Sequence, residues 1–307
     1  MKSTHLLHRI LNQSGNKTLL DQLVSLPNSD LNSLLMEVFR QKAAQLTPSI
    51  LQHHYETNRF VGPADLDVLS FMEFELALLK QANEWGFLPL ELSPVSPLGA
   101  CSAVATVHQD KIITALRGTE VTADATNLIA LECAKRRKKG HFNEQIEQFC
   151  SIHRHVRTPL LKGALSFSHF KIFCLVSAGR AQPNYAFEYK YLLHHIQFYV
   201  SYLTNLQFFD ALTIVLKNVS SNDTLYPRLC EWVERNLGNQ VRLQREDSPQ
   251  HYYQHIQFKI WVSKQGETYE LADGGFVNWT QQLTNNRKER MMSSGLGIER
   301  LFKLLYG

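Results

Sequence analysis

The sequence has few of the features that mark secreted proteins, membrane proteins or zinc ribbons. Its 307 residues include only five cysteines, which are scattered without paired spacing at positions 101, 133, 150, 174 and 230. This distribution argues against a disulfide framework or a metal ribbon and fits a reducing compartment. No apolar run reaches membrane-spanning length, and the N-terminus lacks a signal-peptide core. We therefore expect a soluble, cytoplasmic protein with no membrane partner.

Strong charge of one sign is also missing, as are internal repeats and low-complexity segments. The 32 basic and 28 acidic residues leave a net charge of +4. Basic residues cluster only in Lys135–Lys139 and in Arg287–Arg290. The first run is most simply a solvated helix end that the helix dipole favours. A nucleic-acid accessory protein is an alternative that depends on these runs alone, so we do not expect a nucleic-acid partner.

Apolar content of 44% is sufficient for a substantial core in one or two domains. Residues 1–65 contain the helical patterns LLDQLVSL and LNSLLMEVFRQKAAQL and end at a Gly-Pro joint. We predict that residues 1–65 form an N-terminal helical extension and residues 66–307 form the main unit. The extension is either a partner-binding element or additional core.

The first part of the main unit alternates between helices and short strands. We predict a long helix from Asp65 to Glu84 that ends at Gly86, followed by a proline-flanked edge strand at residues 88–95. Strands are expected at Cys101–Val107 and Lys111–Leu116, and a helix at Asp124–Lys139. Residues 141–158 are polar and rich in histidine, and no ligand spacing accompanies His153 and His155. We expect these histidines to face solvent and expect no metal site.

The second part shows stronger apolar patterns. FKIFCLVS, residues 170–177, predicts a strand that is followed by a loop and by an amphipathic helix at residues 189–203. Residues 211–217 predict a strand and residues 224–237 a helix. A hairpin is expected from strands at Tyr252–Val262 and Thr268–Ala272, with Asp273-Gly274-Gly275 breaking the second strand.

The end of the chain has the pattern of a site for a phosphate-bearing ligand. Gly295 and Gly297 lead into an apolar helical face that begins at Ile298, and Arg300 lies in its first turn. Glycines let backbone approach a ligand closely, and a guanidinium at a helix N-terminus attracts negative charge. An ion pair between Arg300 and Glu299 is the simpler alternative.

These stretches together resemble the catalytic core of class II aminoacyl-tRNA synthetases. GLGIERL resembles the third class II signature motif, and the HYYQHIQF and ELADGGFVNW strands are similar to the amino-acid pocket of histidyl-tRNA synthetase. The helix and strand of residues 65–97 resemble the first motif, which forms the dimer interface in that family. FKIFCLVS and the residues after it occupy the place of the second motif. The resemblance covers residues 66–307 and depends mainly on the order of five motifs.

The resemblance implies an α+β fold with a mostly antiparallel sheet flanked by helices, and a homodimer. It also implies ATP and Mg²⁺ as cofactors. In the nucleotide site, Arg180 would hold the α-phosphate, Arg300 the γ-phosphate and Phe187 the adenine, beside Gly295 and Gly297. Catalysis would then be mainly charge neutralisation and positioning by Arg180 and Arg300.

In the substrate pocket, the resemblance implies that Glu120 and Thr122 hold a substrate ammonium group. A helix-capping or ion-paired carboxylate is the alternative for Glu120. The residues that would line the rest of the pocket are Tyr252, Tyr253, Gly274 and Gly275.

The sequence also departs from the family pattern. Val176–Gly179 stands where the family has Phe-Arg-x-Glu, Ser248–Tyr253 replaces Arg-Gly-Leu-Asp-Tyr-Tyr, and Phe276–Asn278 replaces Arg-Tyr-Asp. The chain ends seven residues after Arg300, so we expect no anticodon-binding domain.

Two functions follow as hypotheses. The first is an enzyme that activates a small amino or carboxylic acid with ATP and transfers the acyl group to a non-tRNA acceptor, for example a protein. The second is a degenerate subunit that binds a small molecule or regulates a partner enzyme without turnover. The missing Arg-x-Glu favours the second, and the retained GLGIER favours the first.

Overall fold

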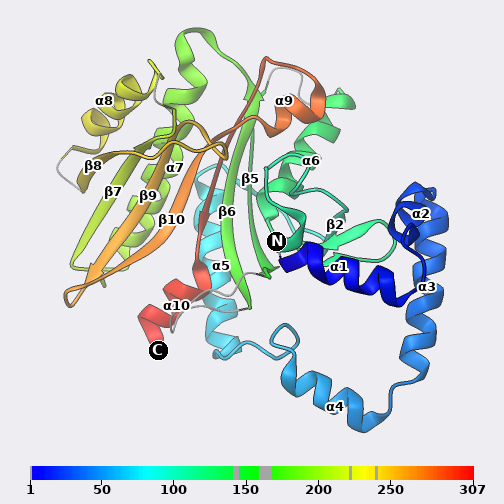
Figure 1. Cartoon of the computed structure of the whole chain (residues 1–307). Coiled ribbons are helices and arrows are strands. Elements are labelled where there is room, and N and C mark those ends of the chain that lie inside the picture. The colour runs from blue at the N-terminus through cyan, green and yellow to red at the C-terminus, as the bar shows by residue number, and fades with distance from the viewer. Residues whose placement is uncertain (1, 141–144, 159–167, 221–222, 239–240) are drawn as a thin grey trace.

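A large mixed sheet forms the centre of the molecule in the computed structural model, which describes residues 2–140, 145–158, 168–220, 223–238 and 241–307 (Figure 1). Its strands are β1 (Leu88–Pro89), β5 (Glu147–Val156), β6 (His169–Arg180), β7 (Ala211–Asn218), β8 (Arg242–Asp247), β9 (Gln254–Lys264), β10 (Glu267–Val277) and β11 (Glu289–Leu296). Their spatial order is β1-β5-β6-β11-β10-β9-β7-β8. Only the outer pairs β1–β5 and β7–β8 are parallel. The expected α+β fold with a mostly antiparallel sheet is confirmed.

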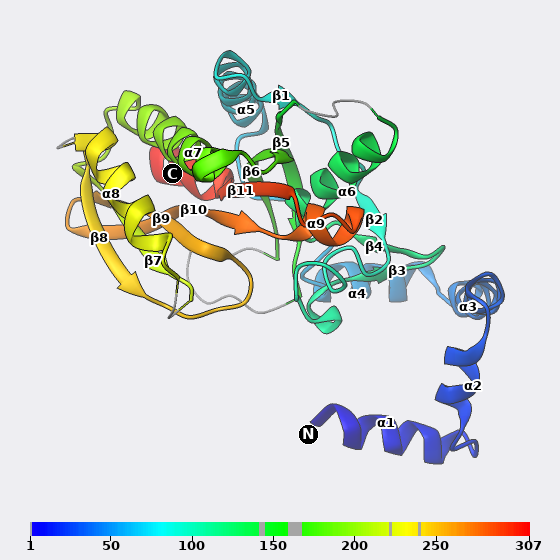
Figure 2. The same ribbon diagram turned by 90° about the horizontal axis from the view of Figure 1, so that it is seen from above.

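Helices cover the two faces of this sheet unequally (Figure 2). One face carries a large apolar core that includes residues of α5 (Val68–Glu84), α7 (Ala186–Asn205), α8 (Tyr226–Leu237) and α10 (Ile298–Tyr306). On the other face, α6 (Ala125–Lys138) and α9 (Trp279–Thr284) cover a smaller core. We call these the helical face and the open face.

Burial on both faces explains why the sequence of β6 is continuously apolar. Phe173 and Leu175 belong to the core of the helical face, and Cys174 and Val176 belong to the core of the open face. A strand buried on both sides needs no polar alternation. The expected strand at residues 170–177 is therefore present, and it extends to Arg180.

A small second sheet lies beside α6 and consists of β2 (Val95–Pro97), β4 (Thr119–Val121) and β3 (Thr114–Ala115). The expected strand at Cys101–Val107 is wrong, because this segment forms turns closed by Ala103 N–H to Gly99 O and Ala105 N–H to Cys101 O. The expected strand at 88–95 is reduced to β1 and the start of β2, with prolines in both. The small residues of 100–105 favour tight turns over a strand, which needs larger side chains to pack.

The histidine-rich segment of residues 141–158 was interpreted wrongly from its polarity. Its described part contains the ten-residue strand β5, which pairs with β6 along its whole length. His153 and His155 are buried, with exposed fractions of 8% and 1%. Polar residues alternate here because every second side chain faces the interior of the open face and not solvent. Residues 141–144 lie outside the described part of the chain.

The glycine pair of Gly274 and Gly275 does not end a strand, contrary to the expectation. β10 passes through it and pairs with β9 on one side and β11 on the other. A Cβ atom on Gly274 would lie 2.4 Å from Ser294 Cβ, and one on Gly275 would lie 2.6 Å from Ile256 O. The neighbouring strands thus approach too closely for any larger residue.

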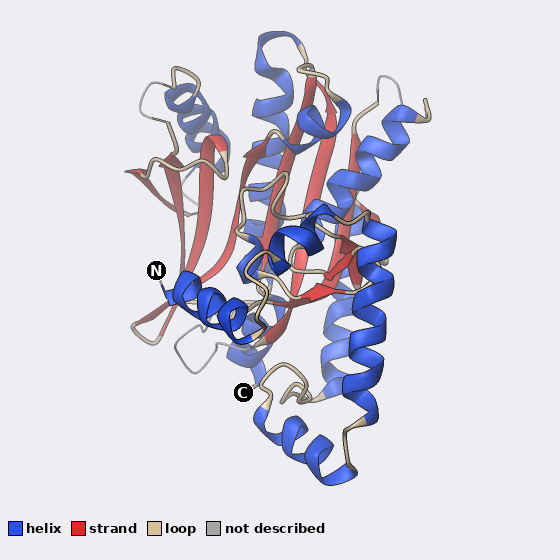
Figure 3. Ribbon diagram, turned by 45° about the vertical axis from the view of Figure 1, so that its right-hand side comes forward, coloured by secondary structure: helices blue, strands red, loops and turns tan. Residues whose placement is uncertain are grey.

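Four helices precede the main unit: α1 (Lys2–Gln13), α2 (Leu19–Ser25), α3 (Asn28–Ala44) and α4 (Pro48–Thr57) (Figure 3). No residue of α2, α3 or α4 is buried. Hydrogen bonds connect these helices to the main unit. Two of them run from Arg117 N–H and Gly118 N–H to the Asn32 side chain. Apolar side chains of the extension therefore remain uncovered in a single chain.

None of the described helices is both long and apolar enough to cross a bilayer.

Candidate functional site

A cavity of about 530 Å³ opens on the open face of the sheet. Its floor consists of residues from β5, β6, β9, β10 and β11, and its rim consists of the turns of residues 101–112, the start of α6 and residues 250–253. Strand alternation separates the two sides of the floor. Gln257 and Asp273 face the cavity, whereas their neighbours Phe258 and Ala272 belong to the core of the helical face.

Two carboxylates and two tyrosines form the acidic side of the cavity. Tyr252 Oη donates to Asp124 Oδ2 over 3.1 Å, and Tyr253 Oη donates to Asp273 Oδ2 over 3.2 Å. Burial, and then the negative charge of nearby aspartates, holds the pKa of both tyrosines well above the usual value, so both phenols remain donors. Gln257 Nε2 donates to the same Asp273 oxygen over 3.2 Å.

Burial is also the main reason that the pKa of Asp273 is raised, and the carboxylate of Glu270 raises it further. A carboxylate in such a position gains from a cationic ligand, because a nearby positive charge stabilises its ionised form. Asp124 is the N-cap of α6, where one oxygen already accepts from Thr126 N–H at 2.9 Å. The acidic side therefore suits an ammonium or another small cation.

Two cations also line the cavity. Arg157 follows β5, and its Nε donates to Ala123 O over 3.2 Å while its guanidinium lies 5.5 Å from the Phe170 ring centre. Lys111 is exposed and forms no ion pair with any residue that the structure describes. Since neither cation forms an ion pair with a carboxylate within the described ranges, the two cations suit an anionic group of a ligand.

His155 is a neutral group in the cavity wall. Burial lowers its pKa to about 3, although Asp124 acts in the opposite direction. Its Nε2 accepts Ala125 N–H over 3.0 Å, so the proton lies on Nδ1. Nδ1 is buried without a partner among the described residues. Such an unpaired donor is costly unless a ligand or water accepts from it.

A chain of buried hydrogen bonds supports the cavity from the helical face. His195 of α7 lies between Ser177 Oγ, 3.0 Å from Nε2, and Ser294 Oγ, 2.8 Å from Nδ1. Tyr199 Oη is 3.0 Å from the same Ser294 oxygen. Burial holds the pKa of His195 well below its usual value, so the ring stays neutral. The network fixes β11 against α7 behind the cavity.

The substrate residues expected from the sequence are only partly brought together. Tyr252, Tyr253 and Gly295 line the cavity. Gly274 and Gly275 lie beside them, and what matters is that they have no side chain. A Cβ on Gly275 would lie 2.7 Å from Tyr253 Cδ1. The glycine therefore leaves the space in which the Tyr253 ring reaches Asp273.

Glu120 and Thr122 lie outside the cavity. The Glu120 carboxylate is fully buried and accepts Gly99 N–H at 2.8 Å, Cys101 N–H at 3.3 Å and Gln109 Nε2 at 2.9 Å. Thr122 Oγ1 donates to Ser93 O over 3.1 Å. In this arrangement both residues stabilise the turns of the rim, and Glu120 has no free oxygen for an ammonium group.

The three residues expected to hold ATP are also outside the cavity and apart from one another. Phe187 is fully buried in α7 and packs on Tyr191, with ring centres 4.7 Å apart. Arg180 ends β6 on the surface, 3.8 Å from Glu289. Arg300 donates to Glu270 O over 2.9 Å, and Gly297 caps α10. None of these three side chains lines the cavity of the open face.

The sequence did not reveal five of the cavity residues, namely Lys111, Asp124, His155, Arg157 and Asp273. Asp273 could have been found from its place before the glycine pair. Lys111, Asp124 and Arg157 gave no signal, and His155 was expected to face solvent, because residues 111–124 and 155–157 converge only through the pairing of β5 with β6 and the placement of α6. Within the described residues no group of three or more histidine, cysteine or acidic side chains could hold a metal ion.

Comparison by sequence finds no matching family model and no matching curated protein. Comparison by structure finds many matches. The apo histidyl-tRNA synthetase of S. aureus has a TM-score of 0.55 and 14% identity, over 77% of this chain and 65% of that one, so this chain spans less than two thirds of that enzyme. A protein from Bacillus halodurans C, titled ATP phosphoribosyltransferase regulatory subunit/histidyl-tRNA synthetase, has a TM-score of 0.63 and 11% identity over 81% and 82%.

A histidine–tRNA ligase subunit from Alicyclobacillus acidocaldarius has a TM-score of 0.59 and 12% identity over 80% of this chain and 98% of that one. Identities this low show a shared fold and leave activity open. The strand order, the flanking helices and these matches agree with the motif order of the sequence. The main unit of this chain has the fold of a class II aminoacyl-tRNA synthetase catalytic core.

Proposed function

We propose that this chain is a synthetase-like subunit that binds a small amino acid or a related zwitterion and acts on a partner protein without turnover. The observation that carries the proposal is the composition of the cavity. The chain has a formed small-molecule pocket, but Arg180, Phe187 and Arg300 all lie outside this pocket. A site of this kind can hold a ligand, and the two guanidinium groups expected to neutralise a transferring phosphate, those of Arg180 and Arg300, are not among its lining residues.

The presence of both carboxylates and cations in the cavity favours a ligand with both charges. An amine would lie between Asp124 and Asp273, and a carboxylate would lie toward Arg157 and Lys111, where Nδ1–H of His155 is a further donor. The volume of about 530 Å³ falls in the ordinary range for small-molecule pockets.

A regulatory role is favoured by what surrounds the pocket. The fold is shared with a protein whose title names a regulatory subunit, and the N-terminal helices present apolar side chains that a partner could cover. All five cysteines are free and buried, which fits a protein of the cytoplasm.

The test is isothermal titration calorimetry of the full chain against the twenty amino acids. We expect binding of at least one amino acid, and we expect Asp273→Asn to weaken it by about tenfold or more, because a charge-assisted contact is lost. Asp21→Asn, at an exposed aspartate of α2, is the matched control. If no amino acid binds, or if the Asp273 variant binds as well as the unmodified chain, the proposal is wrong.

The second candidate function is adenylation of an amino or carboxylic acid with ATP and Mg²⁺. It is favoured by GLGIER at residues 295–300, since Gly295 lines the cavity and Arg300 lies in the first turn of the helix that follows. ATP–pyrophosphate exchange with the same amino acids separates the two functions. We expect no exchange. Amino-acid-dependent exchange that Arg300→Ala abolishes would establish the enzyme in place of the binding subunit.

A further inference from the structure

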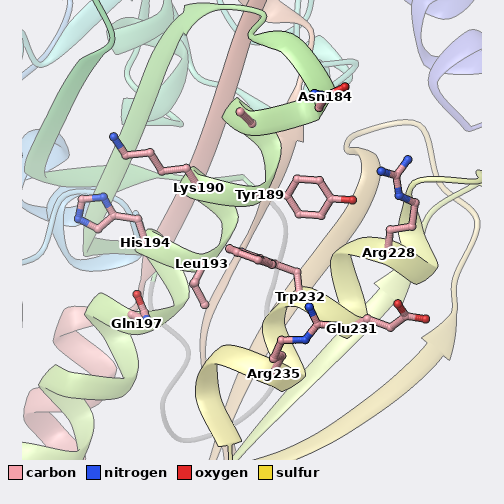
Figure 4. Close-up of a pocket in the computed structure, with 11 residues that line it drawn as sticks. Asn184, Tyr189, Lys190, Leu193, His194, Gln197, Arg228, Glu231, Trp232 and Arg235 are labelled. Carbon is pink, nitrogen blue, oxygen red and sulfur yellow. The ribbon is translucent and has the colours of Figure 1, made fainter.

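A second, separate pocket lies between α7 and α8 on the helical face of the sheet, away from the cavity of the open face. Its volume is about 730 Å³, and its walls are the facing sides of these two helices (Figure 4). Tyr189 and Leu193 recur at helical spacing on α7, and Arg228, Trp232 and Arg235 do so on α8. This spacing brings each set onto one helix side. We call this pocket the α7–α8 groove.

The groove has an excess of unneutralised positive charge. Lys190, Arg228 and Arg235 line it, and none of them forms an ion pair with a residue in the described part of the chain. Glu231 is the one carboxylate among the lining residues of the described structure. The next acidic residue of α8, Glu234, is already engaged by Arg245 at 2.8 Å, outside the groove. Three cations against one carboxylate attract an anion.

An aromatic pair lies between the two arginines of α8 (Figure 4). The Tyr189 and Trp232 rings are 5.5 Å apart at an interplanar angle of 62°, and the Arg228 guanidinium lies 5.9 Å from the Tyr189 ring centre. Trp232 Nε1 is buried and has no acceptor among the described residues. A buried indole N–H without an acceptor costs stability, and an anionic oxygen in the groove would satisfy it.

We propose that the α7–α8 groove binds a small anion that carries a planar ring, of the chemical class of nucleoside monophosphates. The ring packs against Tyr189 and Trp232, and the phosphate is bound by the guanidinium groups of Arg228 and Arg235. The volume matches a single small molecule, since pockets for such ligands measure roughly 300–1,000 Å³. A nucleic-acid strand would need a longer basic track than these two helices present.

The first experiment is calorimetric titration of the full chain with AMP, and with adenosine and ribose 5-phosphate as separate halves of the ligand. AMP should bind more tightly than either half, because only AMP reaches both the aromatic pair and the arginines. The double variant Arg228→Ala/Arg235→Ala should weaken AMP binding by about tenfold or more. Arg242→Ala, at an exposed arginine of the neighbouring strand β8, is the matched control and should bind AMP like the unmodified chain.

The second variant removes one hydrogen bond without removing a ring. Trp232→Phe keeps the aromatic contact but deletes the indole donor, so AMP should bind several-fold more weakly while adenosine is unaffected. The proposal is overturned if AMP does not bind, or if it binds the double arginine variant as well as the control.

Binding elsewhere is distinguished by one more variant. Asp273→Asn changes the cavity of the open face and should leave AMP binding intact. If this change abolishes AMP binding while the arginine variants do not, the nucleotide occupies the other cavity and the proposal fails. It also fails if a twelve-nucleotide single-stranded oligoadenylate binds the groove much more tightly than AMP, because the site then belongs to a nucleic-acid surface.

Discussion

Gly275 and Tyr253 show how one residue of the cavity depends on another that touches no ligand. The Tyr253 ring lies where the side chain of any residue at position 275 would begin, with Cδ1 only 2.7 Å from an added Cβ. The sequence indicated that the tyrosine and the glycine belong to one pocket. The sequence could not show that Gly275 leaves space for the Tyr253 ring and does not itself contact a ligand.

Replacing Gly275 with alanine should displace the Tyr253 ring and break its bond to Asp273. Since the other close atom, Ile256 O, is backbone and cannot move freely, we expect a loss of about 1–3 kcal/mol in the free energy of unfolding. Urea denaturation measures this loss. Gly266→Ala in the β9–β10 turn is a useful comparison, because no atom lies within 4 Å of its added Cβ and only its φ of +86° is unfavourable. A variant at Gly275 that is as stable as the original chain would contradict the packing argument.

His155 should make the stability of the protein dependent on pH. Its folded pKa of about 3 lies below the usual value, so the folded chain stays unprotonated where the unfolded chain takes up a proton. The contribution of His155 to the free energy of unfolding is therefore fully present above pH 6.5 and is lost as the pH falls from 6.5 toward 3. About 2 kcal/mol of the free energy of unfolding is lost between pH 7 and pH 5. His153, whose pKa is also lowered by burial, adds in the same direction.

The variant His155→Leu tests this account. At pH 7 it should be less stable by about 1–3 kcal/mol, because Ala125 N–H loses its acceptor. At pH 5 the gap to the unmodified chain should be smaller by about 2 kcal/mol, since leucine takes up no proton in either state. Urea unfolding at both pH values measures the gap, and His53→Leu on α4 shows the effect of removing an exposed histidine. A gap of equal size at both pH values is the result that would refute the assignment.

At the scale of elements, α5 has two apolar sides and only one of them is covered. Phe71, Phe74 and Leu78 are buried against the sheet, whereas Leu69, Met72 and Leu76 are 75%, 59% and 52% exposed. A helix that is apolar on its outer side as well usually has a partner there. We predict that this stripe forms a homodimer interface, as expected from the resemblance of residues 65–97.

The charged double variant Leu69→Glu/Met72→Glu should convert the dimer into a folded monomer. Burying two carboxylates in an apolar interface costs far more than the interface gains from the remaining contacts. Light scattering at micromolar concentration gives the mass, and circular dichroism checks the fold. Ala77→Glu, at an exposed position that is turned well away from this stripe around α5, should leave the dimer intact. A monomeric mass for the unmodified chain is sufficient to reject the interface.

Elements with a strong single period were predictable from the sequence, and elements with mixed patterns were not. α5 and α10 carry apolar residues at helical spacing, and β6 is apolar throughout because both its faces are covered. β5 was missed because its buried residues include Ser151, His153 and His155, so its alternation resembles that of a surface loop. One of these polar residues, His155, lines the cavity.

For the whole molecule, the order of motifs predicted the fold more reliably than any motif predicted its residues. The helix, strands and final helix follow in the order of a class II core, and the sheet assembles as that order implies. The residues of the cavity come from segments as distant as positions 111 and 295, so their convergence follows from the topology and not from local spacing.

The last prediction concerns the division between the N-terminal helices and the main unit. A chain that begins at Val61 should retain one cooperative thermal transition by circular dichroism. The removed helices α2, α3 and α4 bury no residue, and Asn32 and Arg59 tie the extension to the main unit through hydrogen bonds. Each such hydrogen bond contributes about 0.5–1.5 kcal/mol, which is small compared with the stabilisation from the apolar core of the helical face.

A chain that begins at Glu73 should lose the transition, because it also lacks Phe71, whose ring packs 5.0 Å from that of Phe302. If the chain from Val61 melts without cooperativity, the extension is part of the folded core and the boundary near residue 65 is wrong.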